Sequence, residues 1–302
     1  MSTYRQNVYI ATLPRSGSTM LGMMLGNHSD IFHIGESSYW GKINPRNVKC
    51  SCGEVGCRVL SAVYNRVSGS NSVASIYYAC RVIDRLEEPE KICHELSLPA
   101  IGDNLEVEDV TNLGAKIESS CSGIEELAEA FRRLRTEGVM VDNTKCISIG
   151  RQISEREGWK VILLTRDPRG LAYSNKKSGI RKNVLRSVHS KIPVYLNFAR
   201  KASELISLPN LLHVRYEDLC ENPINTLIRI ADFIGVSFEG VMLRFKGDRG
   251  HTLMGNRMRF DGNQRVREDV DWIDGLTKAE KEEITSNGEL VSLFERLGYS
   301  LK

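Results

Sequence analysis

Hydrogen-bond donors are concentrated near the start of the chain in the segment PRSGST, residues 14–19, which separates two apolar runs. Pro14 and Gly17 mark a tight turn, and the serine and threonine that follow are residue types that often begin helices. The backbone N–H groups of such a turn and the positive end of a helix dipole together bind an anion. The side chains that can add donors to this anion site are Arg15, Ser16, Ser18 and Thr19.

This turn differs from the phosphate-binding loop of nucleoside triphosphatases and P-loop kinases. That loop has the pattern G-x-x-x-x-G-K-[ST], in which the lysine binds the terminal phosphates. Thr12 and Ser18 stand where the first glycine and the lysine would be. A small-molecule kinase of the P-loop class is therefore kept only as an alternative, together with a non-catalytic nucleotide-binding module.

A second group of anion-binding residues follows the apolar run KVILLT, Lys160–Thr165, which is typical of a buried parallel strand. Arg166 comes directly after this run, and Ser174 lies two turns into the helix expected to follow. A guanidinium and a hydroxyl in this arrangement can converge on one phosphate. The alternative is that Arg166 pairs with Asp167 or Asp142 and that Ser174 is an ordinary surface serine.

Together the two motifs resemble those of the sulfotransferases that use 3′-phosphoadenylyl sulfate (PAPS), in particular the bacterial, Golgi-type carbohydrate and tyrosylprotein enzymes. The strand–PRSGST–helix segment resembles their 5′-phosphosulfate loop, and R-D-x-R-x-x-x-x-S resembles their 3′-phosphate site. The resemblance implies transfer of a sulfuryl group from PAPS to a hydroxyl or amine, without a metal. It implies that the 5′-phosphosulfate is bound by Arg15, Ser16, Gly17, Ser18 and Thr19, and the 3′-phosphate by Arg166 and Ser174.

The same resemblance assigns two further residues to the donor site and reveals one departure. It implies that Tyr216, in a strand-end R-Y-E segment, packs near the adenine, and that a late loop containing Arg257 closes over the donor. The tyrosylprotein relatives carry an arginine four residues after the 3′-phosphate serine. Ser178 stands there in this chain, which leaves Lys176 or Lys177 as substitutes.

The candidate general base is Glu36, which follows a second predicted strand. An acceptor hydroxyl must lose its proton as the new S–O bond forms, and a carboxylate beside the phosphosulfate loop can accept it. Arg15 and Lys145 are the cations expected to stabilise charge on the departing phosphate. The alternatives are a structural ion pair between Glu36 and Arg15 or Lys145, and a histidine base such as His251.

Composition and cysteine spacing narrow the class of protein. The chain has 302 residues and a formal net charge of +3, which does not favour a nucleic-acid partner. The absence of an 18-residue apolar run leads us to expect a cytoplasmic protein without a membrane anchor. Cys50, Cys52 and Cys57 are closely spaced, but a structural zinc site needs four ligands and no fourth lies nearby in sequence. We therefore expect free thiols and no metal.

Alternating strands and helices predict an α/β fold with a P-loop-NTPase-like, doubly wound parallel sheet flanked by helices. We expect one domain over residues 1–302, with a mainly helical cap inserted at residues 37–137 that binds the acceptor. That acceptor is expected to be a carbohydrate or another small molecule rather than a protein tyrosine. The expected strands are Asn7–Leu13, Asp30–Ile34, Val139–Val141, Lys160–Thr165 and Leu211–Val214, and a long helix is expected over Val184–Leu208.

Overall fold

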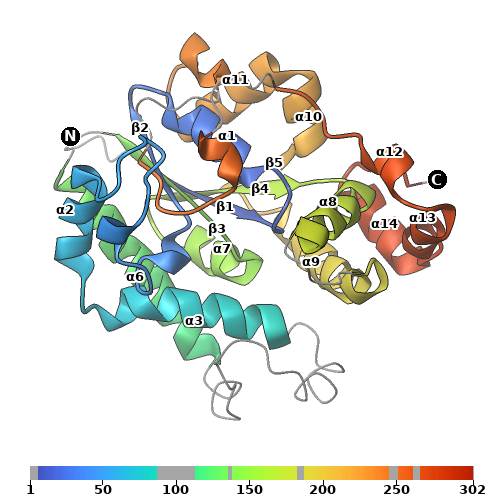
Figure 1. Cartoon of the computed structure of the whole chain (residues 1–302), viewed down its shortest axis with the longest axis horizontal. Helices are drawn as coiled ribbons and strands as arrows, with labels where there is room; N and C mark the ends of the chain where they lie inside the picture. The colour runs from blue at the N-terminus through green and yellow to red at the C-terminus, as the bar shows by residue number, and fades with distance from the viewer. Residues whose placement is uncertain are drawn as a thin grey trace.

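A five-stranded sheet forms the centre of the computed structural model (Figure 1). The strand order is β2-β3-β1-β4-β5, and every neighbouring pair is parallel. The strands are β1 (Asn7–Thr12), β2 (Ile31–Gly35), β3 (Val139–Lys145), β4 (Trp159–Thr165) and β5 (Leu211–Arg215). The structure describes residues 6–86, 113–134, 138–181, 187–244, 251–260 and 266–301. β1 is central, with β3 on one side and β4 on the other, so the strand order reverses at β1. Ligands of such sheets bind at the carboxyl ends of the strands around this point, which here are β1, β3 and β4.

The strands separate two hydrophobic cores, as the alternation of side chains along a strand requires. On β1, Val8 and Ile10 face one core, whereas Tyr9 and Ala11 face the other. All four residues are completely buried. The strand therefore reads as a continuous apolar run, which is the pattern expected when helices cover both faces of a parallel sheet.

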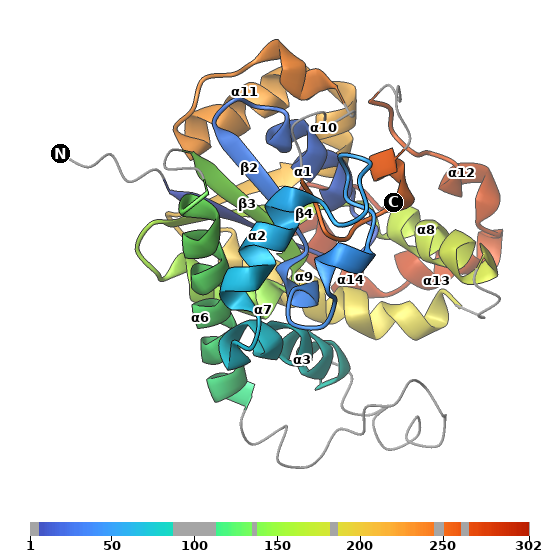
Figure 2. The same ribbon diagram turned by 60° about the vertical axis from the view of Figure 1, so that its left-hand side comes forward.

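Helices cover both faces of the sheet (Figures 1 and 2). One face packs against α1 (Ser18–Gly26), α10 (Tyr216–Glu221) and α11 (Pro223–Ile234), and the other against α6 (Leu113–Arg132), α7 (Ile147–Ser154) and α9 (Ile192–Leu205). The remaining α-helices are α2 (Arg58–Val67), α3 (Asn71–Leu86), α8 (Pro168–Arg181), α12 (Trp272–Gly275), α13 (Lys278–Thr285) and α14 (Gly288–Arg296). The α/β fold class that the sequence predicts is confirmed.

The described part of the insertion between β2 and β3 is mainly helical, as expected. It contains α2, α3 and α6, and the last two cross closely because Gly123 on α6 lies against the backbone of Ser72 on α3. A side chain at Gly123 would collide with that backbone. The proposed role of this insertion in acceptor binding stays a prediction.

Within the part of the chain that the structure describes, no helix combines the length and apolar character needed to cross a membrane.

Two predicted elements are wrong by more than one residue at a boundary. The strand expected at Val139–Val141 continues to Lys145, because its polar residues are buried beside β1 and β2 rather than in a solvent-exposed turn. The helix expected over Val184–Leu208 begins only at Ile192. Pro193 occupies its first turn, where a missing N–H is tolerated, and a short 3-10 helix precedes it. The first residues of the expected helix, 184–186, lie outside the described residues.

Candidate active site

The loop between β1 and α1 has the backbone of an anion site. Gly17 precedes α1 with a φ of 90°, and Arg15 has a φ of 80°, which is rare for a residue with a side chain. No side chain caps the first turn of α1. Ser16 is fully buried, and its hydroxyl has no hydrogen-bond partner among the described residues. A bound anion would satisfy both the open helix terminus and this hydroxyl.

The two predicted phosphate sites meet through direct side-chain contacts. The Arg15 Nε donates a hydrogen bond of 3.0 Å to the Oγ of Ser174. The Nη1 of Arg166 donates one of 2.9 Å to the backbone oxygen of Arg15. Ser174 and Arg166 are both buried, at 4% and 5% exposure. The parallel β1–β4 pairing places the ends of these neighbouring strands at the same edge, which brings Arg15, Arg166 and Ser174 together.

The ring of Tyr216 packs against both Arg166 and Gly17. The Arg166 guanidinium lies 4.4 Å from the centroid of its ring. The ring also packs against Gly17, where a Cβ atom would come within 2.6 Å of the Tyr216 Cδ2. Gly17 is therefore required both by its left-handed conformation and by the tyrosine that packs on it. Tyr216 thus lies between the loop at residues 14–17 and Arg166, and its expected contact with the adenine stays a prediction.

A segment that the sequence analysis missed covers the Arg166 side of the site. The Arg166 Nη2 donates a hydrogen bond of 3.0 Å to the backbone oxygen of Asp269 and lies 3.5 Å from its carboxylate. The backbone N–H of Asp269 donates to the hydroxyl of Tyr216 at 3.1 Å. Arg166 thus pairs with Asp269, and neither Asp167 nor Asp142 takes that place. Asp269 carries no sequence signal for this role, since it lies in a run of charged residues without periodicity.

The lysines expected to replace the missing arginine separate into two environments. The Lys177 Nζ lies 3.7 Å from the carboxylate of Asp269 and 2.9 Å from that of Asp271. Lys176 instead pairs with Glu280 at 2.7 Å, on α13. Of the two residues, Lys177 is the one whose charge is shared with the Arg166 side of the site.

Glu36 and Lys145 form an ion pair at the ends of the neighbouring strands β2 and β3. Both side chains are mostly buried, with exposures of 16% and 14%. Lys145 has a φ of 82°, a conformation that costs a residue with a side chain about 1–3 kcal/mol and occurs mainly at functional sites. The contact between Glu36 and Lys145 is the ion pair that the sequence analysis named as an alternative, and it brings the two candidate catalytic groups together.

A buried carboxyl group supports the strained end of β3. Asp142 accepts hydrogen bonds from the backbone N–H of Thr144 at 2.8 Å and of Ser37 at 3.5 Å. Burial raises the pKa of Asp142 to about 6, although these hydrogen bonds oppose that rise. Because Ser37 follows Glu36 directly, Asp142 links the backbones on both sides of the Glu36–Lys145 pair.

The late segment 251–260 crosses close to the first turn of α1, and Figure 1 shows it in orange beside that helix. The backbone N–H of Asn256 donates a hydrogen bond of 3.2 Å to the Oγ1 of Thr19. Arg257 begins the 3-10 helix Arg257–Phe260 in this segment, and its contact with the donor stays a prediction. His251, the first residue of this segment, contacts a cysteine, with its Nδ1 3.2 Å from the Sγ of Cys57. That contact directs its ring toward the cysteines.

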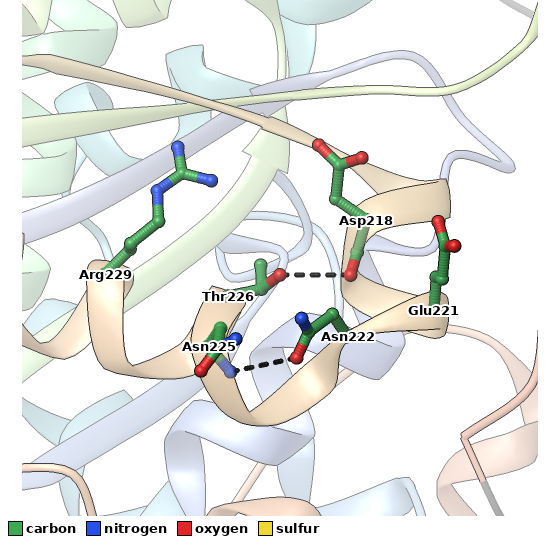
Figure 3. Close-up of a pocket in the computed structure, with 6 residues that line it drawn as sticks. All are labelled: Asp218, Glu221, Asn222, Asn225, Thr226 and Arg229. Atoms are coloured by element: carbon green, nitrogen blue, oxygen red, sulfur yellow. Dashed lines mark hydrogen bonds between the residues drawn. The ribbon is translucent and has the colours of Figure 1, made fainter.

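An open pocket of about 540 Å³ lies on a different part of the molecule, along α10 and α11 (Figure 3). Its lining residues are Asp218, Glu221, Asn222, Asn225, Thr226 and Arg229. None of the sequence-predicted site residues belongs to it. Two carboxylates against one guanidinium make it a poor site for a nucleotide with several phosphates.

Residues 148–248 match the family model described as a sulfotransferase domain. In the comparison with solved structures, the sulfotransferase domain from the curacin biosynthetic pathway has 16% identity and a TM-score of 0.50, over 99% of this chain and 99% of that chain. A sulfotransferase domain from the Synechococcus olefin synthase has 18% identity and a TM-score of 0.48, over 98% and 95%. A mouse sulfotransferase complexed with PAP has 12% identity and a TM-score of 0.47, over 96% and 89%. No curated protein matches the chain.

The matched residues include one half of the site described above. Arg166, Ser174 and Tyr216 lie within them, whereas the loop at residues 14–17 and the Glu36–Lys145 pair precede them. At 16% identity, the likeness to the curacin-pathway domain shows the fold alone. The family match supports the resemblance stated from the sequence motifs: residues 148–248 of this chain match a sulfotransferase domain.

Proposed function

We propose that the protein is a sulfotransferase that takes a sulfuryl group from PAPS and transfers it to a hydroxyl or amine of an acceptor. The observation that carries this proposal is the linkage of Arg15, Ser174 and Arg166. Two hydrogen bonds, of 3.0 and 2.9 Å, join the phosphosulfate loop to the predicted 3′-phosphate residues. A nucleotide with anionic groups at both its 5′ and 3′ positions would engage both halves of this arrangement.

The residues present fit such a donor. The buried, unpartnered Ser16 hydroxyl and the uncapped first turn of α1 after the left-handed Gly17 are features of a cradle for a phosphate group. The donor, when bound, supplies an activated sulfuryl group next to a phosphate leaving group. Its 5′ end would be held by Arg15, Ser16, Gly17, Ser18 and Thr19, and its 3′-phosphate by Arg166 and Ser174.

In the proposed reaction, Glu36 accepts the proton of the acceptor hydroxyl. Lys145 is paired with Glu36 in the structure, and its ammonium group would stabilise negative charge on the leaving phosphate oxygen. Arg15 supplies a second cation on the side of the loop. These fixed cations provide the electrostatic stabilisation that kinases obtain from Mg²⁺, so the proposed transfer needs no metal.

The acceptor is proposed to be a carbohydrate or another small molecule, bound by the insertion that follows Glu36. Tyr39 and Tyr77 support this proposal, because their ring centroids are 6.1 Å apart and Tyr39 is close to Glu36 in the chain. The Lys42 Nζ donates a hydrogen bond of 3.0 Å to the hydroxyl of Tyr77. Aromatic faces with nearby donors suit a sugar ring or a flat alcohol, and a protein tyrosine is a less favoured acceptor.

Calorimetric titration with 3′,5′-bisphosphoadenosine (PAP) tests the donor. We expect PAP to bind without Mg²⁺ and about tenfold or more tightly than ADP, since a charge-assisted hydrogen bond contributes about 1.5–3 kcal/mol. A preference for Mg·ATP would contradict the proposal and favour the P-loop kinase. Radiolabelled PAPS with a panel of alcohols, sugars and amines then tests transfer. Tight PAP binding without any turnover would indicate a nucleotide-binding module instead.

A further inference from the structure

We infer that Cys50, Cys52, Cys57 and His251 form a structural zinc site. Their four ligand atoms all lie within 4.8 Å of one another. Cys50 and Cys57 are buried, and Cys52 and His251 are partly buried. The sequence analysis expected no metal because a fourth ligand was missing near the cysteines. His251 supplies that ligand from a segment near the other end of the chain.

The distances between the ligand atoms agree with tetrahedral coordination. With Zn–S bonds of about 2.3 Å and Zn–N bonds of about 2.0–2.1 Å, a sulfur and a nitrogen on one tetrahedral zinc are about 3.6 Å apart. The Nδ1 of His251 lies 3.2 Å from the Sγ of Cys57 and 3.8 Å from the Sγ of Cys50. Small side-chain adjustments therefore suffice to place an ion between them.

The backbone of the loop at residues 50–57 brings its three thiols close together. The backbone N–H of Gly53 donates to the oxygen of Cys50 at 2.9 Å, and the N–H of Cys50 donates to the oxygen of Glu54 at 2.9 Å. Gly53 and Gly56 have φ values of 94° and 71°, which allow the chain to turn back to Cys57. All three cysteines are free thiols in the structure, so no disulfide competes for these sulfur atoms.

Independent contacts hold His251 against this loop. The backbone N–H of Thr252 donates a hydrogen bond of 2.9 Å to the hydroxyl of Ser51, between the first two cysteines. The ring of His251 stacks on Phe32, with centroids 6.1 Å apart and an angle of 19°.

Three thiolates and a neutral imidazole would leave one net negative charge on a zinc centre. Arg259 interacts electrostatically with Cys50 and is placed to offset it.

The donor set identifies the kind of site. Three cysteines and one histidine are a closed, four-coordinate set that prefers Zn²⁺ and leaves no position for a substrate or water. The metal would therefore tie the segment 251–260 to the loop that contains the cysteines. Because Asn256 in that segment contacts Thr19, the zinc would also fix one side of the phosphosulfate loop. This last consequence depends on the proposed function, whereas zinc binding itself does not.

The first experiment measures metal content. Protein prepared without a histidine tag is reduced, stripped by a chelator and reloaded with Zn²⁺ or Co²⁺ alone. We expect one zinc per chain after gel filtration by mass spectrometry of the metal. Co²⁺ should give thiolate charge-transfer bands and the intense visible bands of a tetrahedral site. Failure to retain zinc, or the weak spectrum of octahedral Co²⁺, would overturn the inference. A disulfide among these cysteines that persists in the presence of reductant would overturn it as well.

Matched variants assign the ligands. Cys57→Ser and His251→Ala should weaken zinc affinity on the order of 100-fold, because each ligand carries a share of the affinity of a structural zinc. His251→Cys should restore binding as a four-cysteine site. The controls are Cys80→Ser, which removes a thiol on α3, and His189→Ala, which removes an exposed imidazole. Unchanged zinc affinity in both ligand variants would exclude this site.

Amide hydrogen exchange separates this inference from the proposed function. Zinc removal should increase exchange in residues 251–256 and leave α11 unchanged, whether or not the protein binds PAP. Loss of zinc without any change in this segment would contradict the tethering role. Zinc binding together with failure to bind PAP would contradict the proposed function alone.

Discussion

Arg166 contacts three segments that are distant in sequence, through Arg15, Tyr216 and Asp269. Arg169, in the same motif, points elsewhere and pairs with Asp167 at 2.7 Å. We expect Arg166→Ala to lower PAP affinity about 10- to 100-fold and to abolish the preference of PAP over ADP, since it removes the proposed charge-assisted partner of the 3′-phosphate. Arg169→Ala is the matched control. Calorimetry checks this prediction, and a retained preference in Arg166→Ala would contradict the assignment.

At Glu36, removal of the carboxylate charge tests the proposed base. Glu36→Gln should reduce turnover by about 10²- to 10⁴-fold while leaving PAP affinity nearly unchanged. Lys145→Ala should also slow turnover, because the cation at the leaving oxygen is lost. The double variant should be little slower than the slower single variant if the pair acts as one unit. Initial rates with a saturating acceptor give this comparison, and wild-type turnover in Glu36→Gln would remove it from the mechanism.

At the scale of elements, β2 carries a buried histidine that makes the fold sensitive to acid. The ring of His33 packs beneath Gly22 and Gly26 of α1, and burial lowers its pKa to about 3 from an ordinary value of 6.5. The unfolded chain therefore binds a proton below pH 6.5 that the folded chain excludes until about pH 3. Stability falls as the pH drops through this window.

From His33 alone, the free energy of unfolding should fall by about 2 kcal/mol between pH 7 and pH 5. The leucine in His33→Leu cannot titrate. Between pH 7 and pH 5, the free energy of unfolding of this variant should therefore fall by about 2 kcal/mol less than that of the wild type. Urea unfolding of both proteins at the two pH values provides the measurement. His189→Ala, which changes an exposed histidine, should behave like the wild type. Equal losses in wild type and His33→Leu would show that His33 does not titrate as expected.

Local signals were sufficient to predict where some elements around the candidate site begin and end. The helix after PRSGST begins at Ser18, one of the residue types expected to begin it, and α11 ends at Ile234, where Gly235 caps it with a φ of 88°. The end of β3 could not be predicted, because Asp142 is stabilised by the backbone of Ser37 from another segment. Polar residues normally indicate a turn, and only this tertiary contact makes them part of a strand.

At the scale of the whole molecule, the proposed donor site joins segments that follow three different strands. One ligand that contacts all of them should stabilise the entire fold by mass action. At a PAP concentration 100 times its Kd, the free energy of unfolding should rise by about 2.7 kcal/mol. The Tm should then increase by roughly 5 °C. Thermal unfolding at several PAP concentrations checks this, with AMP, which lacks the 3′-phosphate, as the control. An equal shift with AMP would contradict a role for that phosphate.

At this scale, contacts between residues that are far apart in the chain could not be predicted from the sequence. His251 and Cys57 are 194 positions apart, and nothing local to either residue indicates the other. Asp269 is likewise separated from Arg166 by 103 positions. The fold brings such residues together through the sheet order, which the periodicity of single segments does not encode.

Asp269 gives the site its own competing anion. Under the proposed reaction, donor and product both carry a 3′-phosphate, so each must displace this carboxylate from Arg166 before it binds fully. The carboxylate lowers the affinity for both nucleotides by a similar factor, but only the product has to leave for the next cycle to start. Where product release limits turnover, an internal competitor of this kind shortens the residence time of the spent nucleotide and raises the rate at saturating donor.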